Sequence, residues 1–194
     1  MSAAPPPPLR PARVHEVCGP GAIAFAAIIC AQGTGPVLWL RERGQTGMLA
    51  PSGLAAFCDP ARLLIARTPR QTDTLAVAEE ALRDGTTGLV VAETSRALNL
   101  REGRRLQLAA QAGGATGLCL IPEGMGSPAA ETRWHCAPVF EAGAAADSTP
   151  MRWEIIKNKS GTVGVWHVRW DRTAHRLDVV SPAVERPGAA AAPG

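Results

Sequence analysis

Short blocks of apolar residues alternate along the chain with segments of helical periodicity. Several runs are brief, apolar and bounded by Gly, Pro or charged residues, a pattern typical of buried strands. These runs cover 14–18, 37–40, 62–66, 88–92 and 116–121. The run at 88–92, "GLVVA", contains no polar residue and predicts a central parallel strand that is buried on both faces.

The segments between these strands predict helices. Residues 21–32 form an almost wholly apolar helix, which must be buried on most of its sides. A short helix at 52–57 begins at Ser52, which we expect to be its N-cap. A third helix at 71–84 stops at Gly85, and a fourth runs from Asn99 to Ala112 with Glu102 completing an N-cap pair. Repeated strand-then-helix order specifies a parallel sheet with helices on both faces.

Beyond Glu131 the pattern changes to consecutive alternating strands. "TRWHCAPV", "MRWEIIKN", "GVWHVRW" and "RLDVV" follow one another with loops between them, which predicts an antiparallel meander. We therefore expect an α/β fold, with a mainly parallel sheet and flanking helices that continues into this C-terminal meander. The single domain is predicted to cover 14–181, between a flexible Pro-rich tail at 1–13 and a flexible Ala/Pro/Gly-rich tail at 182–194.

Composition excludes several classes of protein. With 46% hydrophobic and 19% charged residues over 194 positions, the chain has ordinary globular usage. Its longest apolar run, at 22–31, is too short to span a bilayer, and its N-terminus lacks an apolar signal segment, so we expect a cytoplasmic protein with no membrane partner. The five cysteines form no C-x-x-C pair and the four histidines are scattered, so we expect reduced thiols and no metal site.

The first strand is followed by "GPGAIAFA", which has the frame of a phosphate-binding loop without its chemistry. Gly19, Pro20 and Gly21 open the loop, but in the register G-x-x-x-x-G-K-[ST] Ala24 replaces the second Gly. Phe25 stands where the Lys belongs, and Ala26 where the Mg²⁺-binding hydroxyl belongs. We therefore expect no bound nucleotide or other cofactor, and a first helix that packs on something apolar.

Several quoted segments together resemble one family. "HEVCGP", "GPVLWLRERG", "DPARLLIAR", "AEEALRDG", "GRRLQLAAQAGG" and "ETRWHCAP" are similar to the ImuA family, the shortened RecA-like proteins of bacterial DNA-damage mutagenesis cassettes. The resemblance spans 14–180. It implies a RecA-type core and a role in SOS-induced translesion synthesis. The implied partners are an ImuB-type relative of Y-family polymerases, an error-prone replicative-type polymerase, and RecA itself.

The resemblance also maps recombinase functional positions onto this chain. Glu42, at the end of the second strand, occupies the place of the glutamate that activates water. Ala92 occupies the place of the Mg²⁺-binding carboxylate, and Glu93, one residue later, faces the other side of the strand. The two loops that grip single-stranded DNA correspond to the short segments 95–100 and 123–130. The chain's two lysines, Lys157 and Lys159, match a "KNK" that reaches across a protomer boundary, so they are interface candidates.

Two functional hypotheses depend on chemistry at these positions. A nucleotide hydrolase would use Glu42 as general base, although the missing groups remove most of the mechanism and Glu42 is expected to pair with Arg41 or Arg43. A nucleic-acid binder would use an arginine cluster around the fourth helix, with tryptophans for base stacking. The arginines are Arg96, Arg101, Arg104 and Arg105, and the tryptophans are Trp134, Trp153, Trp166 and Trp170. Tryptophans at alternating strand positions are more typical of a core.

A third hypothesis needs no catalytic residue. In it the chain is a non-catalytic RecA-like accessory protein of the translesion complex, an adaptor for an ImuB-type partner. We favour this hypothesis because it agrees with the missing groups. The alternative is a recombinase-like protein that binds nucleotide or single-stranded DNA weakly and modulates RecA.

Overall fold

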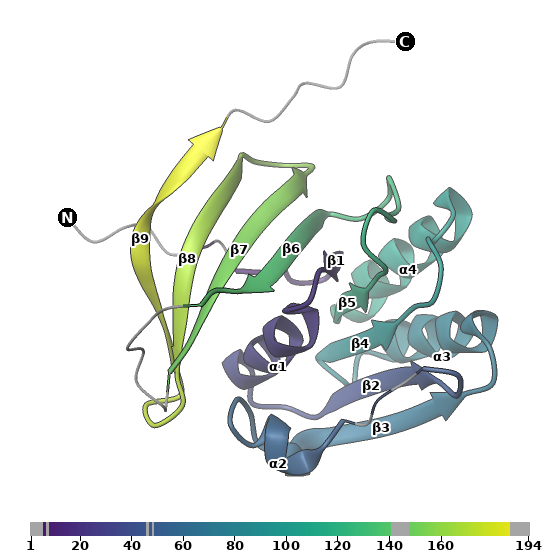
Figure 1. Ribbon diagram of the computed structural model, residues 1–194. Helices are drawn as coiled ribbons and strands as arrows, with labels where there is room; N and C mark the ends of the chain where they lie inside the picture. The colour runs from purple at the N-terminus through teal and green to yellow at the C-terminus, as the bar shows by residue number, and fades with distance from the viewer. Residues whose placement is uncertain (1–5, 7, 46, 48, 141–147, 187–194) are drawn as a thin grey trace.

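A single mixed sheet runs through the computed structural model, which describes residues 6, 8–45, 47, 49–140 and 148–186 (Figure 1). Its nine strands have the order β3-β2-β4-β5-β1-β6-β7-β8-β9. The first six strands in this order, from β3 across the sheet to β6, are parallel to one another. They are β1 (Val14–Cys18), β2 (Val37–Glu42), β3 (Leu63–Thr68), β4 (Leu89–Glu93), β5 (Thr116–Leu120) and β6 (Thr132–Pro138).

The last three strands form the predicted antiparallel meander. They are β7 (Ser148–Asn158), β8 (Val163–Asp171) and β9 (Arg176–Arg186), each antiparallel to the strand before it. The predicted α/β class, with a parallel half continuing into a meander, is therefore confirmed. Strand β9 reaches Arg186, beyond the expected core boundary at 181, and Leu9 of the predicted N-terminal tail packs against the core. Residues 1–5, 7 and 187–194 of the predicted tails lie outside the described residues.

Helices cover both faces of the sheet. They are α1 (Ala22–Gln32), α2 (Pro51–Leu54), the 3₁₀ turn η1 (Pro60–Arg62), α3 (Gln71–Asp84) and α4 (Leu100–Gly113). The expected pair of Asn99 and Glu102 forms a complete capping box, and Gly85 ends α3 in the left-handed region at φ 74°. Ser52 is not an N-cap, because Pro51 already starts the helix and Ala50 precedes it without a side-chain bond.

The sheet divides the core into two layers. Helices α3 and α4 lie over one face of the parallel half and enclose a core that includes Leu40, Leu82 and Leu106. Helix α1 lies on the other face, where the meander curves around it (Figure 1). In the described parts of the chain, no helix is long and apolar enough to cross a membrane.

An aromatic cluster joins α1 to the meander. The ring of Phe25 lies 5.3 Å from that of Trp134 and 4.6 Å from that of Trp153, measured between centroids, and Trp134 lies 6.0 Å from Trp166. All four side chains are buried, as is Trp170 farther along β8. The interpretation of these tryptophans as core residues is confirmed, as is the expectation that α1 packs on an apolar surface.

Replacing Phe25 tests how much this cluster contributes to stability. We expect Phe25→Ala to lower the free energy of unfolding by about 3–5 kcal/mol, because the cavity is surrounded by rigid indole rings. Phe140→Ala is the matched control, since Phe140 is 93% exposed, and should change stability by less than about 0.5 kcal/mol. Urea unfolding of both variants measures the difference, and equal losses would show that the cluster does not hold the two halves together.

Candidate functional site

The segment with the sequence frame of a phosphate-binding loop is a tight turn between β1 and α1. Gly19 has φ 91°, and a Cβ atom at this position would lie 2.6 Å from the carbonyl oxygen of Cys136. The backbone N–H of Gly21 donates to that same oxygen at 2.8 Å. The turn therefore rests directly on the end of β6, and one of its amide groups is already used.

Helix α1 begins too early to leave room for a phosphate cradle. Its first residue is Ala22, so only the three residues from Gly19 to Gly21 separate strand from helix. In a phosphate loop, a longer stretch of backbone N–H groups surrounds the anion and a lysine neutralises it. Here Pro20 is exposed, Ala24 is half-buried, and Phe25 and Ala26 are buried in the helix. Phe25 thus points into the aromatic cluster.

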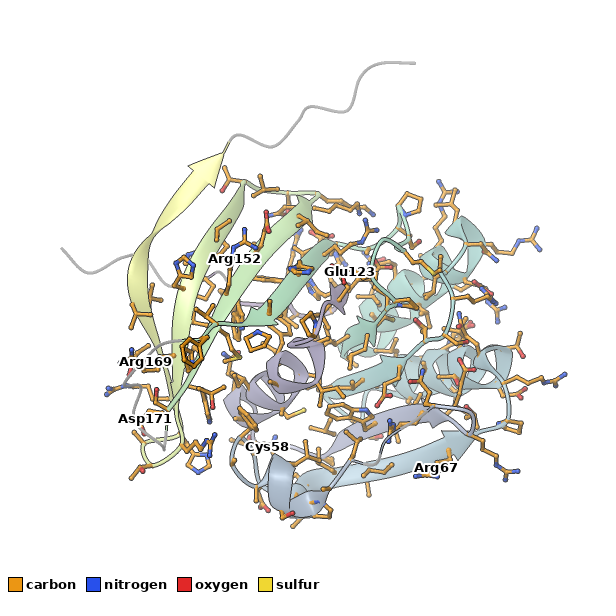
Figure 2. The ribbon with its side chains drawn as sticks, viewed as in Figure 1. Cys58, Arg67, Glu123, Arg152, Arg169 and Asp171 are labelled. Atoms are coloured by element: carbon orange, nitrogen blue, oxygen red, sulfur yellow. The ribbon has the colours of Figure 1, made fainter. Side chains whose placement is uncertain are left out.

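An unexpected acid–imidazole pair lies beside this turn. His135 Nε2 of β6 is 2.9 Å from Glu123 Oε1, and the same nitrogen would lie 2.9 Å from a Cβ atom on Gly19. Figure 2 shows Glu123 in the loop that follows β5. Sequence reasoning missed this pair because the two residues come from different elements, and only the three-dimensional fold brings them together.

Glu42 lies at the end of β2, as the comparison with recombinases requires, but it makes a different contact from the one expected. Both of its carboxylate oxygens accept from the Ser95 hydroxyl at 3.1 Å. The predicted pairing with Arg41 or Arg43 is wrong for Arg41, whose guanidinium turns to Glu93, and no ion pair of Arg43 occurs among the described residues. Glu42 therefore anchors the loop after β4.

Glu93 is part of a buried ion pair. Its Oε1 atom lies 2.7 Å from Arg41 Nε and accepts from Trp39 Nε1 at 2.8 Å, with Arg41 and Glu93 each about 5% exposed or less. Arg41 also donates to the carbonyl oxygen of Gly47. Because β4 continues through Glu93, this carboxylate serves an internal contact. Across the described residues, no group of three or more His, Cys, Asp or Glu side chains could hold a metal ion.

The segment Pro122–Glu131 forms a strap that crosses from the end of β5 to the start of β6. Buried Glu16 accepts from the Ser127 backbone N–H and from Arg133 Nε, both at 2.8 Å. Arg133 in turn donates to the carbonyl oxygen of Ser127. Most of the segment that corresponds to the second DNA-gripping loop, 123–130, is therefore fastened to the core.

Both lysines hold this strap. Lys157 Nζ donates to the carbonyl oxygens of Pro128 (3.1 Å) and Ala130, and Lys159 Nζ donates to that of Ala129 at 2.8 Å. Both side chains therefore reach the same segment from one side of the chain. Lys157 is half-buried and Lys159 is exposed. Their contacts are with this chain's own backbone, and their role at an interface stays a prediction.

The four arginines around α4 do not act as one cluster. Arg96 makes a two-pronged contact with Glu102 at 2.7 and 2.9 Å. Arg105 pairs with Glu79 of α3 at 2.6 Å. Arg101 and Arg104 are exposed and have no ion pair or hydrogen bond within the described residues. Only these two guanidinium groups are thus available for an anion, and DNA contact stays a prediction.

Comparison with known proteins relates the chain to curated sequences. No protein-family model matches the chain. Two curated proteins, both called Protein ImuA, from Caulobacter vibrioides strains NA1000 / CB15N and ATCC 19089 / CIP 103742 / CB 15, are each 30% identical to it over 157 residues. The chain is similar to Protein ImuA. The match covers 73% of this chain and 63% of each ImuA protein, so the chain spans less than two thirds of these relatives.

The position of Lys157 predicts an alkaline pH dependence of stability. Burial, with the nearby charges of Lys159 and Arg133, lowers the pKa of Lys157 from 10.5 to about 8. Between these values the unfolded state holds a proton that the folded state has released, so the contribution of Lys157 to stability should rise as pH increases from about 8 to 10.5. Burial raises the pKa of the Cys119 and Cys136 thiols, and these groups act in the opposite direction over the same range, so the lysine contribution is the difference between wild type and a variant without it.

Urea unfolding across this pH range measures the effect. The slope of unfolding free energy against pH should be lower in Lys157→Met than in wild type, whereas Lys159→Met should keep most of the wild-type slope, because desolvation is the largest cause of the shift in the Lys157 pKa. If the free energy of unfolding changed with pH in the same way in wild type and in Lys157→Met, the lowered pKa of Lys157 would be contradicted.

Proposed function

We propose that the chain is a non-catalytic RecA-like accessory protein of damage-induced translesion synthesis, which acts as an adaptor for an ImuB-type relative of Y-family polymerases. Three observations support the proposal: the similarity to Protein ImuA, the parallel half that continues into a meander, and the altered turn after β1. The similarity and the order of strands and helices both agree with what the resemblance of the quoted segments implies.

The turn after β1 carries most of the weight. A nucleotide hydrolase depends on positioning and charge stabilisation around the phosphates. Here Phe25 is buried among tryptophans, the Gly21 amide donates to the carbonyl oxygen of Cys136 in β6, and Glu93 forms an ion pair with Arg41. Residues at or beside the positions that would bind phosphate and Mg²⁺ are thus engaged in contacts within this chain. A fold that persists with such changes favours binding to a partner over catalysis.

The alternative, a weak binder of single-stranded DNA that modulates RecA, has less support. Its proposed stacking residues are buried, and two of its four arginines are occupied by carboxylates. Arg101 and Arg104 remain for phosphate contact. Binding that depended on them would weaken steeply with rising salt, and Arg101→Ala with Arg104→Ala would flatten that dependence.

Calorimetric titration with Mg-ATP tests the non-catalytic part of the proposal. We expect neither measurable binding nor hydrolysis by the isolated chain. Phe25→Lys should not create activity and should reduce stability, because it places an ammonium in an apolar cluster with no phosphate to pair with. Micromolar affinity, together with hydrolysis that Glu42→Gln abolishes, would overturn this part.

Co-purification with the ImuB-type protein tests the adaptor role. The two proteins should elute together, and deletion of the gene should abolish damage-induced mutation while ordinary growth continues. If the chain has no affinity for this partner and deletion leaves mutation after DNA damage unchanged, the adaptor role fails.

A further inference from the structure

An open groove of about 480 Å³ lies between α4 and the strap, away from the turn after β1. Leu100, Arg104 and Leu108 line one wall at intervals of four residues, which places them in one row along the helix. Pro128 and Ala129 of the strap line the other wall together with Lys159, and Gln107 of α4 lies in the lining and bonds to Ala129. Figure 1 shows the strap passing beside α4.

Exposed leucines make the groove apolar along its length. Leu108 is 65% exposed and Leu100 is 43% exposed, although each belongs to a helix whose opposite side packs well against the sheet. Single exposed leucines are ordinary, but two in one row beside a groove are typical of a surface that a partner covers.

The groove is preformed. The strap lies so close to α4 that a Cβ atom on Gly103 would be 2.5 Å from Ser127 Oγ and 2.7 Å from Ala129 Cβ. Gln107 Nε2 donates to the carbonyl oxygens of Val14 and Ala129 at 2.8 and 3.0 Å, and so ties helix, strand and strap together. A wall held in this way loses little conformational entropy when a ligand binds.

Charge on the groove has one sign. Its lining contains the cations of Arg104 and Lys159 and no carboxylate. Arg101 follows the lining residue Leu100 on α4 and adds a third cation beside the groove. Neither Arg101 nor Arg104 has an ion-pair partner in the described parts of the chain. The nearest acidic residue along α4, Glu102, is bonded to Arg96. A segment that binds here therefore gains most from carboxylates placed beside apolar side chains.

We propose that this groove binds an acidic segment of a partner protein, with apolar side chains seated between Leu100 and Leu108 and carboxylates facing Arg104 and Lys159. The inference rests on the proposed function in taking the occupant to be a partner protein. Single-stranded DNA fits less well, because its bases need exposed aromatic rings and the groove lining contains none.

Peptide selection on the purified 194-residue chain tests the groove directly. One displayed library combines Asp and Glu with Leu, Phe, Ala and Ser, a second replaces the acids by Lys and Arg, and oligothymidylate serves as the nucleic-acid probe. We expect acidic peptides with at least one Leu or Phe to be recovered and the basic library to yield no binder. Recovery of basic peptides, or of no acidic peptide, would overturn the proposal.

Matched substitutions locate the binding. Leu108→Ala and Arg104→Glu should each lower the affinity of the chain for the selected peptide by about tenfold or more. The controls are Leu64→Ala and Arg67→Glu on β3, which make the same chemical changes as Leu108→Ala and Arg104→Glu. Both control positions are exposed, Leu64 to 56%. Figure 2 shows Arg67 on this distant strand. Equal loss in groove and control variants would mean that overall charge or hydrophobicity governs the binding, and would overturn the proposal.

The nucleic-acid probe and the ImuB-type protein separate the groove site from the adaptor role. If oligothymidylate binds in a manner that Arg104→Glu abolishes while acidic peptides do not bind, the groove is a nucleic-acid site and the proposal is wrong. If the ImuB-type protein binds wild type and groove variants equally, the groove inference fails while the adaptor role stands. If acidic peptides bind in the groove but the ImuB-type protein does not bind at all, the adaptor role fails while the groove site stands.

Discussion

The packing of Phe25 against Trp134 and Trp153 is the contact on which the rest of the molecule depends. It attaches α1, which follows the first parallel strand, to strands that come more than a hundred residues later. The meander can curve around α1 because Trp166 extends the same cluster. The apolar ring that joins the two halves also occupies the position at which a phosphate-binding protein would carry its lysine.

Acidic residues at or after the carboxyl ends of the parallel strands also make contacts within the chain. Glu42 holds Ser95, Glu93 holds Arg41, and Glu123 holds His135. Each acid that could have faced a metal or a phosphate thus stabilises a loop or strand end of this chain. Exposed arginines without an ion-pair partner among the described residues occur on α4, at Arg101 and Arg104, and beside the ends of β2 and β3, at Arg43 and Arg67. The acids at this edge of the sheet are thus used in internal contacts, whereas cations stay exposed both there and on α4.

Local signals predicted the elements well and the contacts between distant elements poorly. The apolar run at 14–18, the capping pair of Asn99 and Glu102, and Gly85 each determine structure within a few residues, so they could be recognised along the chain. The contact between Glu42 and Ser95 depends on how two loops meet, and the expected pairing with Arg41 failed because buried Glu93 attracts that guanidinium. The strap could not be foreseen, because its bonds come from β1, α4, β6 and β7.

The proposed function implies that the turn after β1, which has the frame of a phosphate-binding loop, joins the two halves of the molecule through apolar contacts and does not bind nucleotide. Amide hydrogen exchange of residues 19–26 in the 194-residue chain, measured with and without Mg-ATP, tests this implication most directly. We predict equal exchange in both conditions, because the Gly21 amide is bonded to Cys136 and the helix behind it is packed by Phe25. Slower exchange in this segment when Mg-ATP is added, with no change elsewhere in the sheet, would contradict the account.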